Sequence, residues 1–298
     1  MPLVPFPRLL ADARRGRYAV GYFEAWDAYS LEAVAEAAAA ERSPVVLGFG
    51  CLLVDQAWLD AGGIEAHASL GRRVAERAQT PVALLLNEAR SLEHALRGVR
   101  AGFNAVMMHL ADGGSEHATR AVRNLVEAAH AEDVAVEAEL GSLPDAAAGS
   151  FDAGAGVLTD PEAARRFVAE TGVDCLAVSV GNVHLLEGRP APVDLDLLEE
   201  VGRRVDVPLA VHGGTSFPAE AVPRAIAAGV AKLNVGTVLK RAYLAGMAER
   251  VAELAPDADV HAAVGSHAPG DVLEAGKARV TAVVRELMRR YGSSGRAA

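Results

Sequence analysis

The feature that most constrains the fold is an alternation of short apolar runs with longer amphipathic segments, which occurs eight times along the 298 residues. Most of the apolar runs are continuous rather than alternating, which is typical of parallel strands buried on both faces. The predicted strands are Tyr18–Ala25, Pro44–Gly50, Pro81–Asn87, Ala105–Leu110, Val134–Leu140, Cys175–Val180, Pro208–Gly213 and Lys232–Gly236.

The segments between these runs have the apolar spacing of amphipathic helices. The predicted helices are Ser30–Glu41, Gly63–Ala78, Ser91–Ala101, Ser115–Ala131, Asp160–Thr171, Asp194–Arg203, Pro218–Ala228 and Thr237–Leu254. Eight strand–helix units predict an α/β fold of the (β/α)8 TIM-barrel type. An open, doubly wound parallel sheet is the alternative for the same alternation.

Two segments fall outside the alternation, and no linker divides the chain, so we predict a single domain over residues 1–298. Residues 142–156 are rich in Ala and Gly and follow the fifth strand. A long loop in a compact domain is usually functional, so we predict a mobile active-site loop there. Residues 271–298 are predicted to form an additional C-terminal helix, Asp271–Arg290, and a short tail.

Composition excludes several classes of partner. Hydrophobic residues make up 51% of the chain and charged residues 23%, as in a globular protein. A net charge of −10 argues against nucleic acid or an anionic membrane as a partner, because both require a basic surface.

Cys51 and Cys175 lie in apolar strands and are predicted to be buried free thiols, which suits a reducing cytoplasm. The sequence has no signal-peptide pattern and no bilayer-length apolar run, so we expect a cytoplasmic protein.

Polar side chains occur at the ends of many predicted strands, where the active site of a barrel lies. The candidates are Glu24, Asn87, Glu88, His109, Glu137, Glu139, His184 and His212. Imidazoles and carboxylates that converge on one rim indicate a metal site. A structural hydrogen-bond cluster is the alternative interpretation.

Glycine-rich turns follow the last three predicted strands. The motif "HGGTS" contains Gly213, Gly214 and Thr215, and "NVGT" contains Asn234, Gly236 and Thr237. Backbone N–H groups in such turns bind anions at helix N-termini, and these loops of a barrel are a usual phosphate site. Gly181, in "VGNVH" after the sixth strand, belongs to the same candidate phosphate-binding set. The alternative is that these glycines only permit tight turns.

The order of these motifs resembles a known family. The segments "GRYAVGYF", "ERSPVVLGF", "VAVEAELG", "DVPLAVHGGTSFP" and "GVAKLNVGT" are similar to those of the class II, metal-dependent ketose-bisphosphate aldolases. The resemblance covers nearly the whole chain. It implies a divalent metal, usually zinc, held by three histidines, of which His184 and His212 match two. Glu137 and Glu139 match a Glu-x-Glu pair that can bind a second metal. It also implies a phosphorylated sugar substrate and a homodimer or homotetramer.

The clearest departure from the family lies at the end of the third strand. Where the family has His-Leu-Asp-His, this chain has Leu85, Leu86, Asn87 and Glu88. We predict that Glu88 replaces the third metal ligand, giving a two-histidine, one-carboxylate set that suits zinc and also manganese, iron or cobalt. Asn87 replaces an acid/base aspartate, and an amide can hydrogen-bond but cannot exchange a proton at ordinary pH.

Other departures concern proton transfer. Glu24 stands where the family has Asn, and His109 stands where it has Asp. The catalytic Glu of the family's loop falls near Ala146, with Asp145 and Asp152 the nearest acids. The catalytic candidates are therefore Asn87, Glu24, His109 and Asp145, with Glu24 and His109 taking over acid/base roles.

The resemblance and its departures together predict a metal-dependent aldolase. It would cleave or form a ketose phosphate through a metal-stabilised enediolate of a dihydroxyacetone-phosphate-like unit, and it would not be restricted to fructose 1,6-bisphosphate. One alternative is a sugar-phosphate isomerase or epimerase that uses the same enediolate chemistry. The other is a non-catalytic sugar-phosphate-binding partner of another enzyme.

Overall fold

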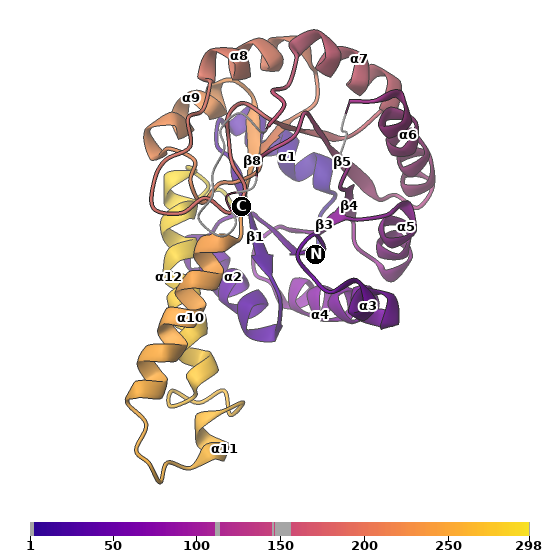
Figure 1. Ribbon diagram of the computed structural model, residues 1–298. Helices are drawn as coiled ribbons and strands as arrows, with labels where there is room; N and C mark the ends of the chain where they lie inside the picture. The colour runs from indigo at the N-terminus through magenta and orange to yellow at the C-terminus, as the bar shows by residue number, and fades with distance from the viewer. Residues whose placement is uncertain (1–2, 111–113, 145, 147–155, 298) are drawn as a thin grey trace.

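Eight parallel strands form a closed barrel in sequence order, with β8 paired to β1 (Figure 1). The computed structural model describes residues 3–110, 114–144, 146 and 156–297. The strands are β1 Val20–Ala25, β2 Val45–Gly50, β3 Val82–Ala89, β4 Ala105–Met108, β5 Ala135–Leu140, β6 Cys175–Val178, β7 Leu209–Val211 and β8 Val230–Val235. The closed barrel confirms the TIM-barrel prediction and is incompatible with an open sheet.

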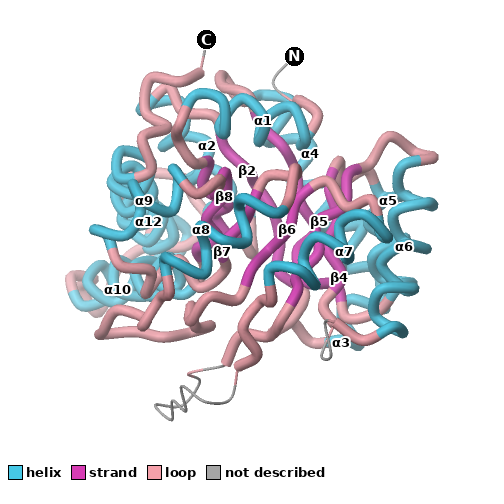
Figure 2. Tube along the Cα trace, turned by 90° about the horizontal axis from the view of Figure 1, so that it is seen from above, coloured by secondary structure: helices cyan, strands magenta, loops and turns pink. Residues whose placement is uncertain are grey.

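Helices surround the barrel on its outside (Figure 2). The longer ones are α2 Ala28–Glu41, α4 Ile64–Arg77, α5 Leu92–Ala101, α6 Glu116–His130, α7 Pro161–Thr171, α8 Leu195–Arg204, α9 Val222–Ala227, α10 Thr237–Ala252 and α12 Val272–Arg290. Short turns of helix are α3 Gln56–Trp58, η1 Leu59–Gly63, η3 Ala219–Ala221 and α11 Val260–Ala263. No helix within the described ranges is both long and apolar enough to cross a membrane.

Side-chain caps explain why many helices begin where they do. Asp27, Ser91 and Ser115 each accept a hydrogen bond from the backbone N–H three residues later, and Asp160 and Asp194 do the same. Such caps satisfy helix donors that have no partner within the helix. The predicted helix starts therefore agree with the observed ones to within a few residues.

Helix α1, Phe6–Gly16, was not predicted and closes the N-terminal end of the barrel. Its buried residues Phe6, Leu9, Leu10 and Ala13 form one cluster with side chains of the barrel interior. The neighbouring backbone is tied to the start of β3, where Val4 N–H donates to the Val82 carbonyl at 2.8 Å. The open, polar end of the barrel is therefore the C-terminal end of the strands.

Helices α10 and α12 pack on each other and extend away from the barrel, with α11 at the far end (Figure 1). They approach closely at Gly246, where a Cβ atom would lie 2.5 Å from the Ala275 carbonyl oxygen. Helix α12 also packs against α2. This confirms the additional C-terminal helix.

Most of the predicted mobile loop, residues 142–156, lies outside the described residues. Its two described ends are paired: Ser142 N–H donates to the Val157 carbonyl at 2.9 Å, and Val157 N–H donates back at 3.0 Å. The mobility of the loop stays a prediction. Cys51 and Cys175 are both buried and free, as predicted.

Candidate active site

A pocket opens at the C-terminal ends of the strands and contains most of the predicted site residues. Its walls come from β1, β2, β3, β7 and β8, and from the loop after β6. The predicted residues that line it are Glu24, Asn87, Glu88, His184, His212, Gly213, Thr215, Asn234, Gly236 and Thr237. Tyr22, Leu52, Leu53 and Leu185 contribute to the same walls.

An irregularity in β3 brings two consecutive polar side chains into this pocket. The strand continues to Ala89, although the sequence pattern predicted its end at Asn87. Leu86 pairs with Val106 and Ala89 with Met108, so β3 holds one residue more than β4 over this stretch. Glu88 has φ of 54°, in the left-handed region that is uncommon for residues other than glycine. Neighbouring residues of a regular strand point to opposite faces, so this bulge is what lets Asn87 and Glu88 share one pocket.

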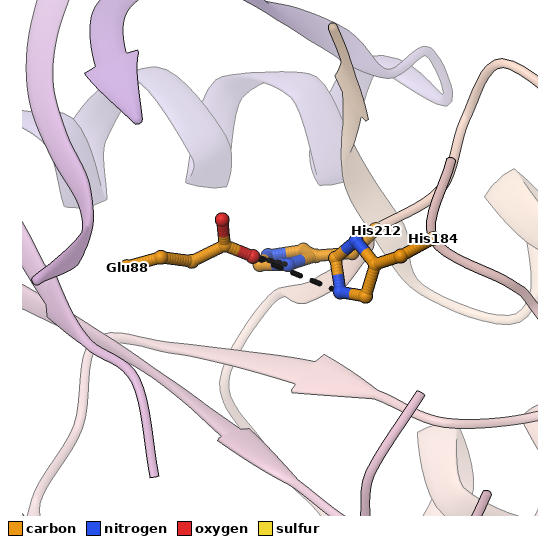
Figure 3. Close-up of side chains that lie close together, drawn as sticks. All are labelled: Glu88, His184 and His212. Carbon is orange, nitrogen blue, oxygen red and sulfur yellow. Dashed lines mark hydrogen bonds and ion pairs between the residues drawn. The ribbon is translucent and has the colours of Figure 1, made fainter. Parts of the chain in front are cut away.

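Glu88, His184 and His212 converge from β3, the β6–α8 loop and the end of β7 (Figure 3). Oε1 of Glu88 lies 3.3 Å from Nδ1 of His212 and 3.7 Å from Nε2 of His184. One ligand atom from each of the three lies within 4.8 Å of the others. This spacing and donor set fit a single divalent ion with a position left open for substrate.

A buried ion pair between Glu137 and Lys232 holds His212 in place. Nε2 of His212 lies 2.9 Å from Oε1 of Glu137, and Nζ of Lys232 lies 2.9 Å from both oxygens of that carboxylate. Glu137 and Lys232 are fully buried. Nε2–H of His212 therefore donates to Glu137, which leaves the Nδ1 lone pair directed toward Glu88 when the ring is neutral. A carboxylate in this position fixes the tautomer and orientation of a metal-binding histidine.

The charges of this cluster depend strongly on one another. Burial alone would raise the pKa of Glu88, but the hydrogen bond from His212 and the nearby charges of His184 and His109 lower it to about 2. Burial would lower the pKa of His212, but its bonds to Glu137 and Glu88 raise it to about 9. His212 is therefore protonated on both ring nitrogens and lies between two carboxylates. A metal ion bound at Nδ1 would displace the Nδ1 proton.

Glu137 and Glu139, the predicted second-site ligands, differ in their surroundings. Glu137 is already engaged by Lys232 and His212. Glu139 has Oε2 3.5 Å from Nδ1 of His212, and no hydrogen bond reaches that oxygen from the described part of the chain. Burial raises the pKa of Glu139. Of the two carboxylates, Glu139 is the one with an oxygen still available to a ligand.

The β7 and β8 turns provide unused hydrogen-bond donors. Asn234 is 7% exposed, and its Nδ2 has no hydrogen-bond partner among the described residues, while its Oδ1 accepts a bond from Lys232. Helix α10 begins at Thr237, and Oγ1 of Thr215 accepts a hydrogen bond from the Val238 N–H at 3.3 Å, so the Thr215 hydroxyl lies at the positive end of the helix dipole. Gly213, Thr215 and Thr237 line the same part of the pocket.

Not every predicted residue lies in the pocket wall. Gly181 and Gly214 are not among its lining residues, and the Gly214 N–H donates to the Asn234 carbonyl at 2.8 Å. His109 lies outside the wall too, although its charge helps to lower the pKa of Glu88. Asp145 and Asp152 fall outside the described residues.

Sequence reasoning missed the supporting role of Lys232. The eighth strand was predicted to begin at Lys232, but β8 begins at Val230. Lys232 therefore lies within the strand, deeper in the barrel than Asn234. The signal was present, because Lys232 and Asn234 are two residues apart and so share the inner face of a strand. The ion pair between Glu24 and Lys240 of α10, at 2.6 Å, was also not foreseen.

Comparison with known proteins agrees with this geometry. Residues 4–296 match the family described as fructose-bisphosphate aldolase class-II. A fructose-bisphosphate aldolase from Geobacillus stearothermophilus is 34% identical over 304 residues, which cover 100% of both chains. The crystal structure of the YdjI aldolase from Escherichia coli K12 is 26% identical, with a TM-score of 0.79 over 99% of this chain and 100% of that one. A fructose-bisphosphate aldolase from Campylobacter jejuni, at 18% identity, supports the fold alone, with a TM-score of 0.76 over 98% of this chain and 96% of that one.

The family match and the aldolase relative show that this chain is an enzyme of the carbon–carbon lyase class, an aldolase. The chain belongs to the class II fructose-bisphosphate aldolase family. Dependence on a divalent metal is general to that family, and the Glu88, His184 and His212 group is able to hold one.

Proposed function

We propose that this enzyme is a divalent-metal-dependent aldolase of a ketose phosphate that is not restricted to fructose 1,6-bisphosphate. The observation that carries the proposal is one shared pocket. It brings Glu88, His184 and His212 together with the glycine-containing turns at Gly213–Thr215 and Asn234–Thr237. A metal site next to an anion site suits cleavage of a phosphorylated ketose.

Glu88, His184 and His212 would hold the metal, and zinc is the first expectation, with manganese, iron or cobalt as alternatives. When bound, a divalent ion supplies Lewis acidity that stabilises negative charge on the substrate oxygens during bond cleavage. Glu137 holds His212 in place through its charge, and Glu139 is the better candidate for a second ligand position.

The phosphate of the substrate would be bound by the turns after β7 and β8. The unpartnered Nδ2 of Asn234 and the positive end of the α10 dipole favour an anion there. Gly213, Thr215, Gly236 and Thr237 complete this group, while Gly181 and Gly214 would act through the shape of their turns.

For proton transfer we propose Glu24 and His109, with the loop residue Asp145 as a further candidate. Asn87 is 4% exposed, and its Oδ1 has no hydrogen-bond partner within the described ranges, so its amide is free to orient a substrate hydroxyl. It cannot itself accept a proton. Turnover of the true substrate should fall by about 100-fold or more in His109→Ala or in Glu24→Gln. Wild-type turnover in both variants would contradict the assignment.

The proposed enzyme acts in the cytoplasm as a homodimer or homotetramer. Exposed apolar side chains on the projecting α10–α12 unit support self-association, among them Leu244 at 60%, Val251 at 54% and Val260 at 68% exposure. Apolar patches of this kind mark protein interfaces.

Retro-aldol cleavage tests the proposal. The metal-loaded enzyme is assayed with a panel of ketose phosphates, and release of dihydroxyacetone phosphate is followed with a coupled reductase. We expect cleavage of at least one member. Exchange of the proton next to the carbonyl without cleavage would instead favour the isomerase or epimerase, which the amide at Asn87 would still allow. Binding without either reaction would favour a non-catalytic role.

A further inference from the structure

Tyr22 is a buried tyrosine of β1 whose side chain forms part of the pocket wall. It is 2% exposed, and its hydroxyl has no hydrogen-bond partner in the described part of the chain. A buried hydroxyl without a partner costs free energy, because it has given up its bonds to water. Packing alone does not require this hydroxyl, because phenylalanine fills nearly the same space. The hydroxyl is therefore placed to serve a ligand that enters the pocket.

The pocket wall holds two more polar atoms of this kind. Oδ1 of Asn87 and Nδ2 of Asn234 are also buried, and neither has a hydrogen-bond partner among the described residues. Tyr22 and Asn234 are register partners in β1 and β8, so their side chains leave neighbouring strands side by side on the inner face. A hydroxyl, an amide oxygen and an amide N–H group together match a ligand that carries both carbonyl and hydroxyl oxygens.

The ring of Tyr22 is held close to the groups that position the metal-binding histidine. A Cβ atom at Gly48 of β2 would lie 2.8 Å from Cε2 of the ring, so this glycine leaves space for the tyrosine. Nζ of Lys232 lies 5.3 Å from the ring centroid, where a cation is attracted to the face of the ring. The same ammonium group binds Glu137, which contacts His212. Tyr22 thus belongs to the buried polar group beneath the pocket.

The hydroxyl of Tyr22 keeps its proton at neutral pH. Burial is the main cause that raises the pKa of Tyr22 well above its usual value, and the charges of Glu24 and Glu88 add to the effect. A neutral hydroxyl can donate a hydrogen bond to an oxygen on which negative charge develops, and such a donor has a large effect where water is excluded. The unpartnered atom of Asn87 is an acceptor, so Asn87 cannot take this role through it.

We infer that Tyr22 is a further catalytic residue, whose hydroxyl donates a hydrogen bond to a substrate oxygen in this pocket. That oxygen gains negative charge when the carbon–carbon bond breaks and its electron pair moves toward it. The inference rests on the proposed function and adds a residue to the same pocket. The tyrosine keeps its proton throughout, so proton transfer stays with Glu24 and His109.

Tyr22→Phe tests the inference, because it removes only the hydroxyl. We expect the zinc-loaded variant to bind dihydroxyacetone phosphate about five- to tenfold more weakly by calorimetry. Its kcat for a cleaved ketose phosphate should fall by about 100-fold, with a smaller change in KM. Binding of inorganic phosphate should not change, because the turns after β7 and β8 are intact. The melting temperature should not fall, because the removed hydroxyl has no partner in the described chain.

Tyr291→Phe is the matched control. Tyr291 is 1% exposed and its hydroxyl also lacks a partner among the described residues, but it does not line the pocket. This variant should leave both binding and turnover unchanged.

The outcomes separate the inference from the proposed function. Wild-type binding and turnover in Tyr22→Phe would assign the tyrosine to packing, overturn the inference and leave the proposed function standing. Weaker binding of dihydroxyacetone phosphate by Tyr22→Phe, without cleavage of any ketose phosphate by wild type, would contradict the proposed function and support the inference. Failure of the wild-type protein to bind dihydroxyacetone phosphate would overturn both.

Discussion

Lys232 and Glu137 form an ion pair with no solvent exposure, in which Nζ lies 2.9 Å from both carboxylate oxygens. The pair contacts His212 through Glu137. The positive charges of Lys232 and His212 hold the pKa of Glu137 below its usual value, against the effect of burial. A buried ion pair adds little net stability, but removal of one partner leaves an uncompensated charge in the interior.

Lys232→Met should therefore lower the free energy of unfolding by about 3 kcal/mol, because Glu137 loses its lysine counter-ion and keeps only His212. The double variant Lys232→Met with Glu137→Gln should recover part of that loss, because no carboxylate is then left without its lysine. Urea denaturation of the two single variants and the double variant measures the coupling. Additive effects of the two substitutions would contradict the charge pairing.

The sequence was sufficient to predict the barrel, because its eight strands are continuous apolar runs with recognisable helix caps between them. The convergence of Glu88, His184 and His212 could also be predicted, since they stand at the ends of such runs or just after one. Helix α1 could have been found as well. Phe6, Leu9, Leu10 and Ala13 have helical spacing, and Pro residues at its start are typical of a helix N-terminus.

The remaining features could not be predicted because they depend on contacts between distant segments. A bulge of one residue in β3 has no pattern of its own, yet it decides that Asn87 and Glu88 face the same pocket. The ion pair of Glu24 with Lys240 joins residues 216 positions apart. Such pairs follow from the closure of the barrel between β1 and β8 rather than from local propensity.

Stability at acidic pH should depend on Glu41, at the end of α2. A hydrogen bond from Arg289 is the main cause that lowers its pKa to about 2, with Arg285 and Ser294 adding to the effect against burial. The unfolded-state pKa is about 4.3, so the stabilisation is complete above that pH and is lost as pH falls toward 2. We expect Glu41→Gln to lower the free energy of unfolding by about 1 kcal/mol at pH 7, because the arginines are partly exposed.

Urea denaturation at pH 7, 5 and 3 measures this difference, which should shrink between pH 5 and 3. The matched control is Glu76→Gln, which removes an exposed pair with Arg73 at 2.8 Å and should change the free energy of unfolding by less than about 0.5 kcal/mol. A difference between wild type and Glu41→Gln that is the same at all three pH values would argue against the ion-pair account.

Self-association should depend on the projecting α10–α12 unit. Leu244→Glu combined with Val251→Glu places two charges on its exposed apolar surface, so we expect the mass measured by light scattering to fall toward that of one chain. Leu158→Glu is the control, because Leu158 is 51% exposed but precedes α7 on the barrel. If the control dissociates the oligomer and the α10 variant does not, the interface lies elsewhere.

The central claim is that Glu88 is a metal ligand together with His184 and His212. Crystals of the zinc-loaded protein, measured at the zinc absorption edge, test it most directly through an anomalous difference map. We predict a peak within about 2.0–2.2 Å of a Glu88 carboxylate oxygen, Nε2 of His184 and Nδ1 of His212. In Glu88→Ala the peak should be lost or strongly reduced. A full-strength peak in Glu88→Ala, or a wild-type peak that Glu88 does not contact, would contradict the account.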